Sequence, residues 1–133
     1  SIVATTIDNK IIMVKQWRYP IEKETLEIPS GTIEDNKDPL ETAKKELLEE
    51  VGGATEHWQK LTNYWIGNGV MRIQGHLFWA KNVTLGESSQ EDTEKISTIL
   101  KDFGVVNEMI VNGEIDDERT IIGVLMLKNI IGK

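Results

Sequence analysis

The feature that most constrains this sequence is one strongly marked helix in the middle of a β-rich chain. Asp38 has the short acceptor side chain that caps helix N-termini, and Pro39 follows at the first helical position, where its missing N–H costs nothing. Glu41 completes the sequence pattern of a capping box, and the predicted helix runs to Val51 and ends at the two glycines 52–53. A chain that holds such a helix between strand patterns folds as a mixture of helix and sheet.

Strand patterns precede this helix. Residues 2–7 and 11–17 are apolar and β-branched, and residues 8–10 between them have turn chemistry, so they predict an antiparallel hairpin. Residues 25–28 predict a short third strand, which ends at Pro29.

Further strand patterns follow the helix, and helices close the chain. The predicted strands cover residues 60–66, 70–81 and 95–100, with a turn at 67–69, a polar loop at 84–95, and helices at 103–111 and from Asp116 or Asp117 to 131. The order strands, helix, strands, helices predicts an α+β fold. The length of 133 residues predicts a single domain over 1–133.

The composition excludes several classes of protein. No cysteine is present, which excludes disulfide bonds and cysteine-ligated metal sites. A formal net charge of −7 without a basic run argues against a nucleic-acid or anionic-membrane partner. No apolar stretch approaches the ~20 residues that span a bilayer, so we expect a soluble, cytoplasmic protein. Because a strand pattern follows Ser1 at once and no Met opens the chain, we expect natural N-terminal residues to precede it.

Three glutamates share one side of the predicted central helix. At about 100° per residue, Glu46, Glu49 and Glu50 fall within one arc. The apolar residues fall in another arc, formed by Ala43, Leu47, Leu48 and Val51. The acidic patch has two interpretations, a solvated face or a site for a hard cation such as Mg²⁺, which binds carboxylate oxygens and substrate phosphates.

A longer pattern around these glutamates favours the cation site. Gly31 is followed after five residues by Lys37 and after seven more by residues 45–52, which read Lys-Glu-Leu-Leu-Glu-Glu-Val-Gly. This spacing resembles the Nudix box, which reads Gly, five residues, Glu, seven residues, Arg-Glu-apolar-any-Glu-Glu-any-Gly-apolar. The sequence keeps both glycines and all three glutamates of the later half, and it departs from the family pattern at Lys37, Lys45 and Gly53.

Segments outside the box are similar to the ADP-ribose pyrophosphatase branch of this family. Residues 16–20, Gln-Trp-Arg-Tyr-Pro, and 26–31, Leu-Glu-Ile-Pro-Ser-Gly, look like the branch's lead-in to the box. Residues 113–117 look like its approach to the last helix. The resemblance implies the Nudix α/β/α sandwich with mixed β-sheets.

The resemblance also implies a metal-dependent hydrolase that uses Mg²⁺ or Mn²⁺ and acts on a nucleoside diphosphate linked to another group. The implied metal ligands are the carbonyl oxygen of Ser30 and the carboxylates of Glu46, Glu49 and Glu50. Glu50 and Glu49 are therefore candidate catalytic residues as well.

A general base is implied on the loop at residues 86–95. Glu91 is our first candidate for it and Glu94 the second, ahead of Glu87. The alternative is that this loop is simply acidic and solvated.

The candidate substrate-binding residues, Trp17, Arg18 and Glu27, precede the box. Arg18 would bind a phosphate through its planar fork, or alternatively pair with Glu27 at the surface. Trp17 and Trp65 would stack on a nucleobase, or alternatively lie in the core or at a dimer interface. The two histidines of the chain lack a partner at ligand spacing, so we expect them to be structural.

The resemblance places the substrate among ADP-ribose and the nucleotide sugars, with a nucleoside monophosphate and a phosphorylated product. The branch carries a proline soon after the box, whereas residues 64–69 at that place contain none, so the substrate loop differs. Lys37 and Lys45 replace side chains that help to hold the box carboxylates in the family. The alternative is therefore a catalytically weak or inactive domain that binds a nucleotide or a regulatory ligand. A homodimer is also left open.

Overall fold

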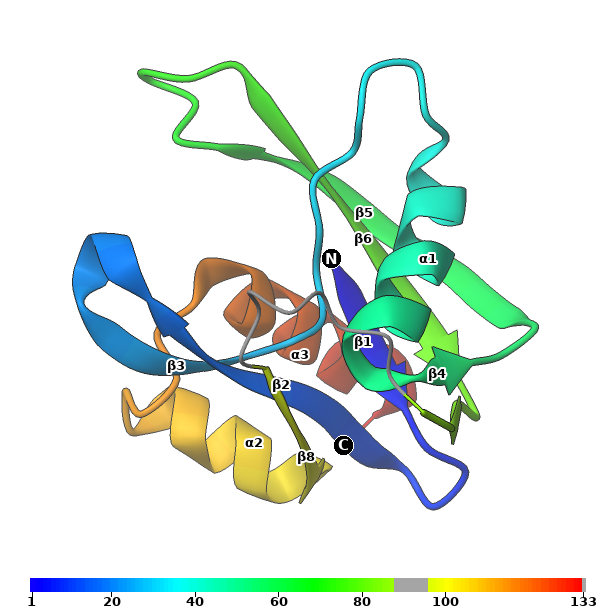
Figure 1. The fold of residues 1–133 in the computed structure, drawn as a ribbon. Coiled ribbons are helices and arrows are strands. Elements are labelled where there is room, and N and C mark those ends of the chain that lie inside the picture. Colours follow the sequence, from blue (N-terminus) through cyan, green and yellow to red (C-terminus); the bar gives the residue numbers. More distant parts are fainter. Residues whose placement is uncertain (88–95, 133) are drawn as a thin grey trace.

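The strands of this protein form one mixed sheet and one short ribbon in a computed structural model that describes residues 1–87 and 96–132 (Figure 1). The sheet has the order β3-β2-β1-β6-β5, and β8 also pairs with β2. β1 runs parallel to β6 and antiparallel to β2. The strands of the sheet are β1 (Ile2–Thr5), β2 (Lys10–Arg18), β3 (Lys23–Glu27), β5 (His57–Ile66), β6 (Ile73–Lys81) and β8 (Ser97–Asp102).

Helices cover both faces of the sheet because strand residues alternate between two apolar clusters. Ile2 and Ala4 of β1 belong to the cluster that includes Leu47 of the central helix, whereas Val3 belongs to the cluster that includes Val124 of the last helix. The helices are α1 (Pro39–Val51), α2 (Phe103–Val111) and α3 (Glu118–Ile131), and a short 3-10 helix, η1, covers Tyr19–Ile21. With α1 on one face and α2 and α3 on the other, this is the predicted α+β fold and α/β/α sandwich.

Helix α1 begins and ends where the sequence predicts. The Asp38 side chain accepts from the backbone N–H groups of Leu40 and Glu41, and Gly52 takes the left-handed conformation at φ 65°. Of the predicted capping box, the half made by the Asp38 side chain is present. The carboxylate of Glu41, which would complete the box, instead accepts a hydrogen bond from Lys44 Nζ at 2.7 Å.

The buried face of α1 differs from the predicted apolar arc. Ala43, Leu47 and Val51 are buried, but Leu48 is 50% exposed, so the buried face covers only part of the apolar arc. Glu50 takes its place and is only 7% exposed. The rotation of α1 therefore turns one of the three glutamates toward the interior.

The predicted first hairpin is confirmed, with its turn earlier than expected. β1 ends at Thr5, because the N–H of Thr6 donates to Lys10 O and Asn9 turns the chain at φ 60°. β3 ends at Glu27 rather than at residue 28, because the N–H of Ile28 donates to Thr120 Oγ1 of α3.

Of the two strands that follow α1 in the sheet, β5 begins earlier than predicted and β6 begins later. β5 begins at His57, whereas β6 begins only at Ile73, because the N–H groups of Val70 and Met71 both donate to Gly67 O. Residues 84–85 were predicted as loop and instead form β7 (Thr84–Leu85), which pairs with β4 (Gly53–Ala54).

The last two helices agree with the sequence. Asp117, and not Asp116, is the N-cap of α3, since its carboxylate accepts from the N–H of Thr120. Among the described residues, no helix combines the length and the apolar character that crossing a membrane requires.

Candidate functional site

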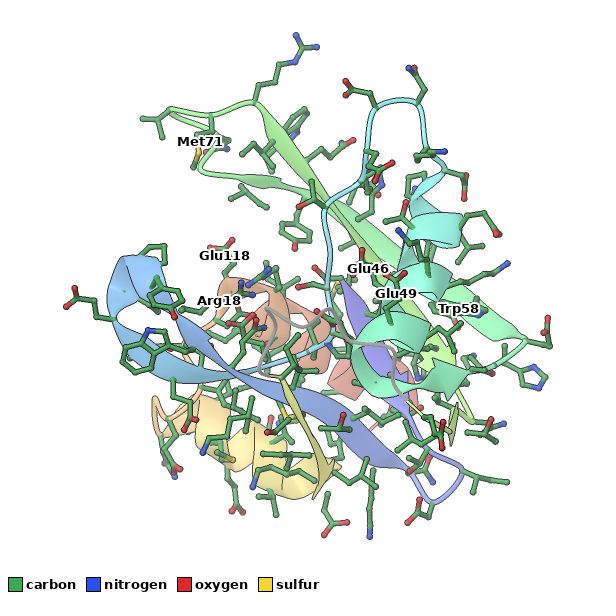
Figure 2. All side chains as sticks on the ribbon, in the orientation of Figure 1. Arg18, Glu46, Glu49, Trp58, Met71 and Glu118 are labelled. Carbon is green, nitrogen blue, oxygen red and sulfur yellow. The ribbon has the colours of Figure 1, made fainter. Side chains whose placement is uncertain are left out.

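A cavity of about 510 Å³ lies beside α1, the loop before it, the β5–β6 hairpin and the first turn of α3. Its polar lining includes Gln16, Arg18, Ser30, Glu46, Glu50, Gln74, His76 and Arg119. Its apolar and aromatic lining includes Ile33, Pro39, Tyr64, Ile66 and Ile73. Figure 2 shows Arg18 and Glu46 reaching from β2 and α1 into the region between these elements. The cavity thus joins acidic, basic and apolar groups from distant parts of the chain.

Glu46 packs directly against the leading glycine of the box. A Cβ atom added to Gly31 would lie 2.0 Å from Glu46 Cδ and 2.3 Å from its Oε1. The absence of a side chain at residue 31 therefore provides the space that the Glu46 carboxylate occupies.

This contact makes Gly31→Ala a test of the position of Glu46. The resemblance implies a hydrolase in which Glu46 binds a metal ion, and on that expectation the rate of hydrolysis should fall about 10-fold, as for other residues that orient a metal-binding carboxylate. The free energy of unfolding should change by less than about 1 kcal/mol, because Gly31 has no positive φ and the displaced group is the end of a flexible side chain.

The matched control is Gly69→Ala, since a Cβ at residue 69 meets no atom within 4 Å. Initial rates and thermal melts of both variants make the comparison. A wild-type rate for Gly31→Ala would show that the carboxylate of Glu46 need not sit where the structure has it.

Glu50 is the buried carboxylate of the site. Its Oε2 accepts a hydrogen bond from the backbone N–H of Ser30 at 3.0 Å. This bond joins the end of α1 to the loop that precedes it, so the two segments that carry the predicted metal ligands are fixed to each other.

Glu49 takes a different direction from Glu46 and Glu50. It does not line the cavity, its side chain is 41% exposed, and its Oε1 lies 3.8 Å from Lys45 Nζ. Within residues 1–87 and 96–132, no three His, Cys, Asp or Glu side chains gather closely enough to hold a metal ion. The structure thus brings two of the three box glutamates together at the cavity.

Glu27 is the most enclosed charge near the site, at 2% exposure. Arg18 donates to it from Nε at 2.8 Å and from Nη2 at 2.6 Å, and Thr25 Oγ1 donates at 2.6 Å. Burial alone would raise the pKa of Glu27, but the hydrogen bonds from Arg18 and Thr25 and the charges of Arg18 and Arg119 hold it below its ordinary value of 4.5. The ion pair considered for Arg18 is therefore present, and Glu27 reaches the cavity only through its partners.

Arg119 is a site residue that the sequence analysis missed. Its guanidinium donates to Glu27 Oε2 at 2.9 Å, to Asp117 Oδ1 at 2.8 Å and to Ser30 Oγ at 3.1 Å. One feature of the sequence points to Arg119, which is its place near the start of the predicted last helix. A cation in the first turn of a helix opposes the helix dipole, so an arginine there needs a compensating partner.

Tyr64 and His76 line the part of the cavity made by the β5–β6 hairpin. The Tyr64 ring lies over Gly75 so closely that a Cβ there would be 2.3 Å from ring atom Cζ. His76 Nδ1 is buried and has no hydrogen-bond partner among the described residues. Burial and the charge of Lys60 lower the pKa of His76.

The two tryptophans considered for stacking do not line the cavity. Gln16 and Arg18 do, and Trp17 between them points to the other face, because neighbours along a strand alternate. Trp17 is 51% exposed and meets Tyr19 edge-on at 6.4 Å between ring centroids, and Trp65 is 54% exposed. Their role in a dimer interface stays a prediction.

The candidate general bases Glu91 and Glu94 lie outside the described residues. The described residues before them contact the end of α1, because the N–H of Gly86 donates to the carbonyl oxygen of Gly52, the C-cap of that helix, at 2.8 Å. Glu87 is the last described residue before them.

The NUDIX domain family model matches residues 1–109. The chain therefore belongs to the Nudix family. The resemblance seen in the box is confirmed, although three of its positions depart from the family pattern.

Two relatives and one solved structure extend this comparison. The chain is 33% identical over 130 residues to a methanol dehydrogenase activator of Bacillus methanolicus. That alignment covers 96% of this chain and 70% of the relative. It is 36% identical over 91 residues to an ADP-ribose pyrophosphatase of Bacillus subtilis (strain 168), covering 68% of this chain and 49% of that protein. The crystal structure of an ADP compounds hydrolase superposes with a TM-score of 0.87 at 17% identity, over 98% of this chain and 70% of that one. That last similarity shows the shared fold.

Proposed function

We propose that this Nudix protein hydrolyses a nucleoside diphosphate linked to a further group, with ADP-ribose or a nucleotide sugar as the substrate. The observation that carries the proposal is that Glu46 and Glu50 line the same cavity as Arg18 and Arg119. Carboxylates attract a divalent cation, and guanidinium groups are suited to phosphate oxygens. The relative named as an ADP-ribose pyrophosphatase supports the substrate class.

The cofactor in this proposal is Mg²⁺ or Mn²⁺. Glu46, Glu50 and the carbonyl oxygen of Ser30 would hold it, with Glu49 acting through water, and all of these donors are the hard oxygens that such cations prefer. Two carboxylates are enough for Mg²⁺ when water and substrate phosphates complete its shell. When bound, the cation neutralises the diphosphate and makes a bound water more acidic.

The other residues of the site bind and orient the substrate. Arg18 uses Nε and Nη2 for Glu27, which leaves its Nη1 to donate to a phosphate oxygen. Glu27 thereby holds the fork of Arg18 in place. Glu91 or Glu94 would accept the proton of the attacking water, and Tyr64 with its apolar neighbours Ile66 and Ile73 would receive the less polar part of the substrate.

A substrate panel tests this function. The protein is incubated with Mg²⁺ or Mn²⁺ and ADP-ribose, nucleotide sugars, dinucleoside polyphosphates or nucleoside triphosphates, and the products are separated by chromatography. We expect ADP-ribose and water to give AMP and ribose 5-phosphate, or a nucleotide sugar to give the corresponding two phosphates. Turnover of triphosphates alone would refute the substrate class.

A second candidate is a binding domain with weak or no hydrolysis. The observation that favours it is a hollow of about 230 Å³ beside the main cavity, in which Lys37 and Lys45 both lie with Glu46. Two lysines cannot pair with each other, so the support that the box carboxylates receive in the family is altered. The relative named as an activator is compatible with such a role. Nucleotide binding without turnover in the panel would support this candidate, and neither binding nor turnover would refute both.

Restoring the family pattern tests whether the lysines weaken the site. The variant Lys37→Glu/Lys45→Arg should raise the rate about 10-fold, because an arginine orients a carboxylate through two hydrogen bonds where a lysine offers a point charge. The two changes should be more than additive, since both side chains line one hollow.

Lys44→Arg is the matched control, because Lys44 lies on the same helix, pairs with Glu41 and does not line this hollow. Steady-state rates of the single and double variants measure the effect. An unchanged rate in the double variant would mean that the lysines are not what limits the site.

A further inference from the structure

The segment 28–30 carries the only predicted backbone metal ligand, and two elements of the described chain hold it. The N–H of Ile2 in β1 donates to Pro29 O at 2.9 Å, and α3 contacts the residues on either side of Pro29. The N–H of Ile28 donates to Thr120 Oγ1 at 2.9 Å, and the Ser30 hydroxyl accepts from Arg119 Nη1 at 3.1 Å. Thr120 is fully buried and its hydroxyl donates to Asp117 Oδ2 at 2.7 Å. The first turn of α3 therefore contacts this segment at both ends.

Arg119 connects this turn to the buried carboxylates on both sides of the segment. Its Nη2 donates to Glu27 Oε2, and its Nη1 donates to Ser30 Oγ. Ser30 in turn donates its backbone N–H to Glu50 Oε2. A chain of hydrogen bonds thus runs from Glu27 through Arg119 and Ser30 to Glu50.

We propose that Arg119 is a positioning residue for the catalytic centre, which fixes Ser30 and through it the carboxylate of Glu50. The inference rests on the proposed function for the role of Glu50. It adds a residue of the last helix to the machinery of the box, 89 residues away in sequence from the serine it holds. Arginine is required because its fork reaches Glu27, Asp117 and Ser30 at once, whereas the ammonium of a lysine is a single point.

The test is a double-mutant cycle of Arg119→Lys and Ser30→Ala, read out by Mn²⁺ affinity from paramagnetic resonance titration and by kcat and KM. Each single variant should weaken Mn²⁺ binding about 10-fold and lower kcat more than it raises KM. The double variant should be no weaker than the worse single variant, because both changes break the same link. Arg119→Lys keeps a cation beside Glu27 and Asp117, so the fold should be retained, as a thermal melt would show.

Lys23→Met is the matched control. Lys23 pairs with Asp116 and so also connects β3 to the approach of α3, but at the surface and without contact to Ser30. We expect its Mn²⁺ affinity to equal that of the wild type. An equal loss in this control would overturn the inference, because any loosening of α3 would then suffice.

The outcomes separate the inference from the proposed function. Three outcomes would overturn the role of Arg119. The double variant could lose about 100-fold in Mn²⁺ affinity, the product of the two single losses; the single variants could lose none; or the wild type could show no saturable Mn²⁺ binding. A wild type that binds Mn²⁺ and shows the expected cycle but turns over nothing in the panel would overturn hydrolysis and support Arg119. A wild type that hydrolyses a substrate of the panel, with independent effects of the two substitutions on Mn²⁺ affinity, would support hydrolysis and overturn the role of Arg119.

Discussion

Replacing Glu50 with glutamine is expected to lower the rate of hydrolysis at least about 100-fold while leaving the protein folded. The change removes the charge of the one box carboxylate that is buried at the cavity, so it weakens the hold on the cation that the diphosphate needs. The amide oxygen of glutamine can still accept the N–H of Ser30, so α1 and the loop before it should stay connected. Initial rates, Mn²⁺ titration and a thermal melt measure the three effects.

Two neighbouring glutamates of α1 sharpen this comparison. Glu41→Gln is the control, because Glu41 lies in the first turn, pairs with Lys44 and is exposed, and its rate should equal that of the wild type. Glu49→Gln should lose less activity than Glu50→Gln, because Glu49 does not line the cavity. A rate for Glu50→Gln within a few-fold of the wild type would exclude Glu50 from the catalytic centre.

The box and the fold could be predicted from the sequence because their signals are local. The helix cap, the closing glycine and the spacing of the glutamates all lie within residues 31–52. The direction of each glutamate could not be predicted in this way. Glu46, Glu49 and Glu50 share an arc, and only the packing of α1 on the sheet decides that Glu50 is buried and Glu49 faces Lys45.

Contacts between distant segments limited the prediction of the site. Arg119 and Ser30 belong to different elements, and no local pattern pairs them. For Trp17 and Arg18, by contrast, the alternation of side chains along a strand does allow a prediction. Adjacent residues of one strand point to opposite faces, so the two could not both face the cavity, and the structure places Arg18 there.

The second large effect is expected for Glu27→Gln, which should lower the free energy of unfolding by about 3 kcal/mol and the melting temperature by about 10 °C. The change leaves Arg18 and Arg119 close together without the carboxylate that both bind. The value is at the low end for a buried pair, because the Arg18 side chain is 36% exposed. Glu24→Gln is the matched control on the same hairpin. Its exposed pair with Lys15 should contribute less than about 1 kcal/mol.

The pH dependence of this difference tests its cause. The pKa of Glu27 in the folded protein lies below its ordinary value of 4.5, so the stabilisation is fully present above pH 4.5 and is lost as the pH falls through the folded pKa. A glutamine resembles the protonated glutamate, so the gap in unfolding free energy between wild type and Glu27→Gln should narrow as the pH falls below 4.5. Denaturant unfolding across this range measures it. A gap that stays constant through the acid range would show that the ion pairs of Glu27 do not cause the difference between the two proteins.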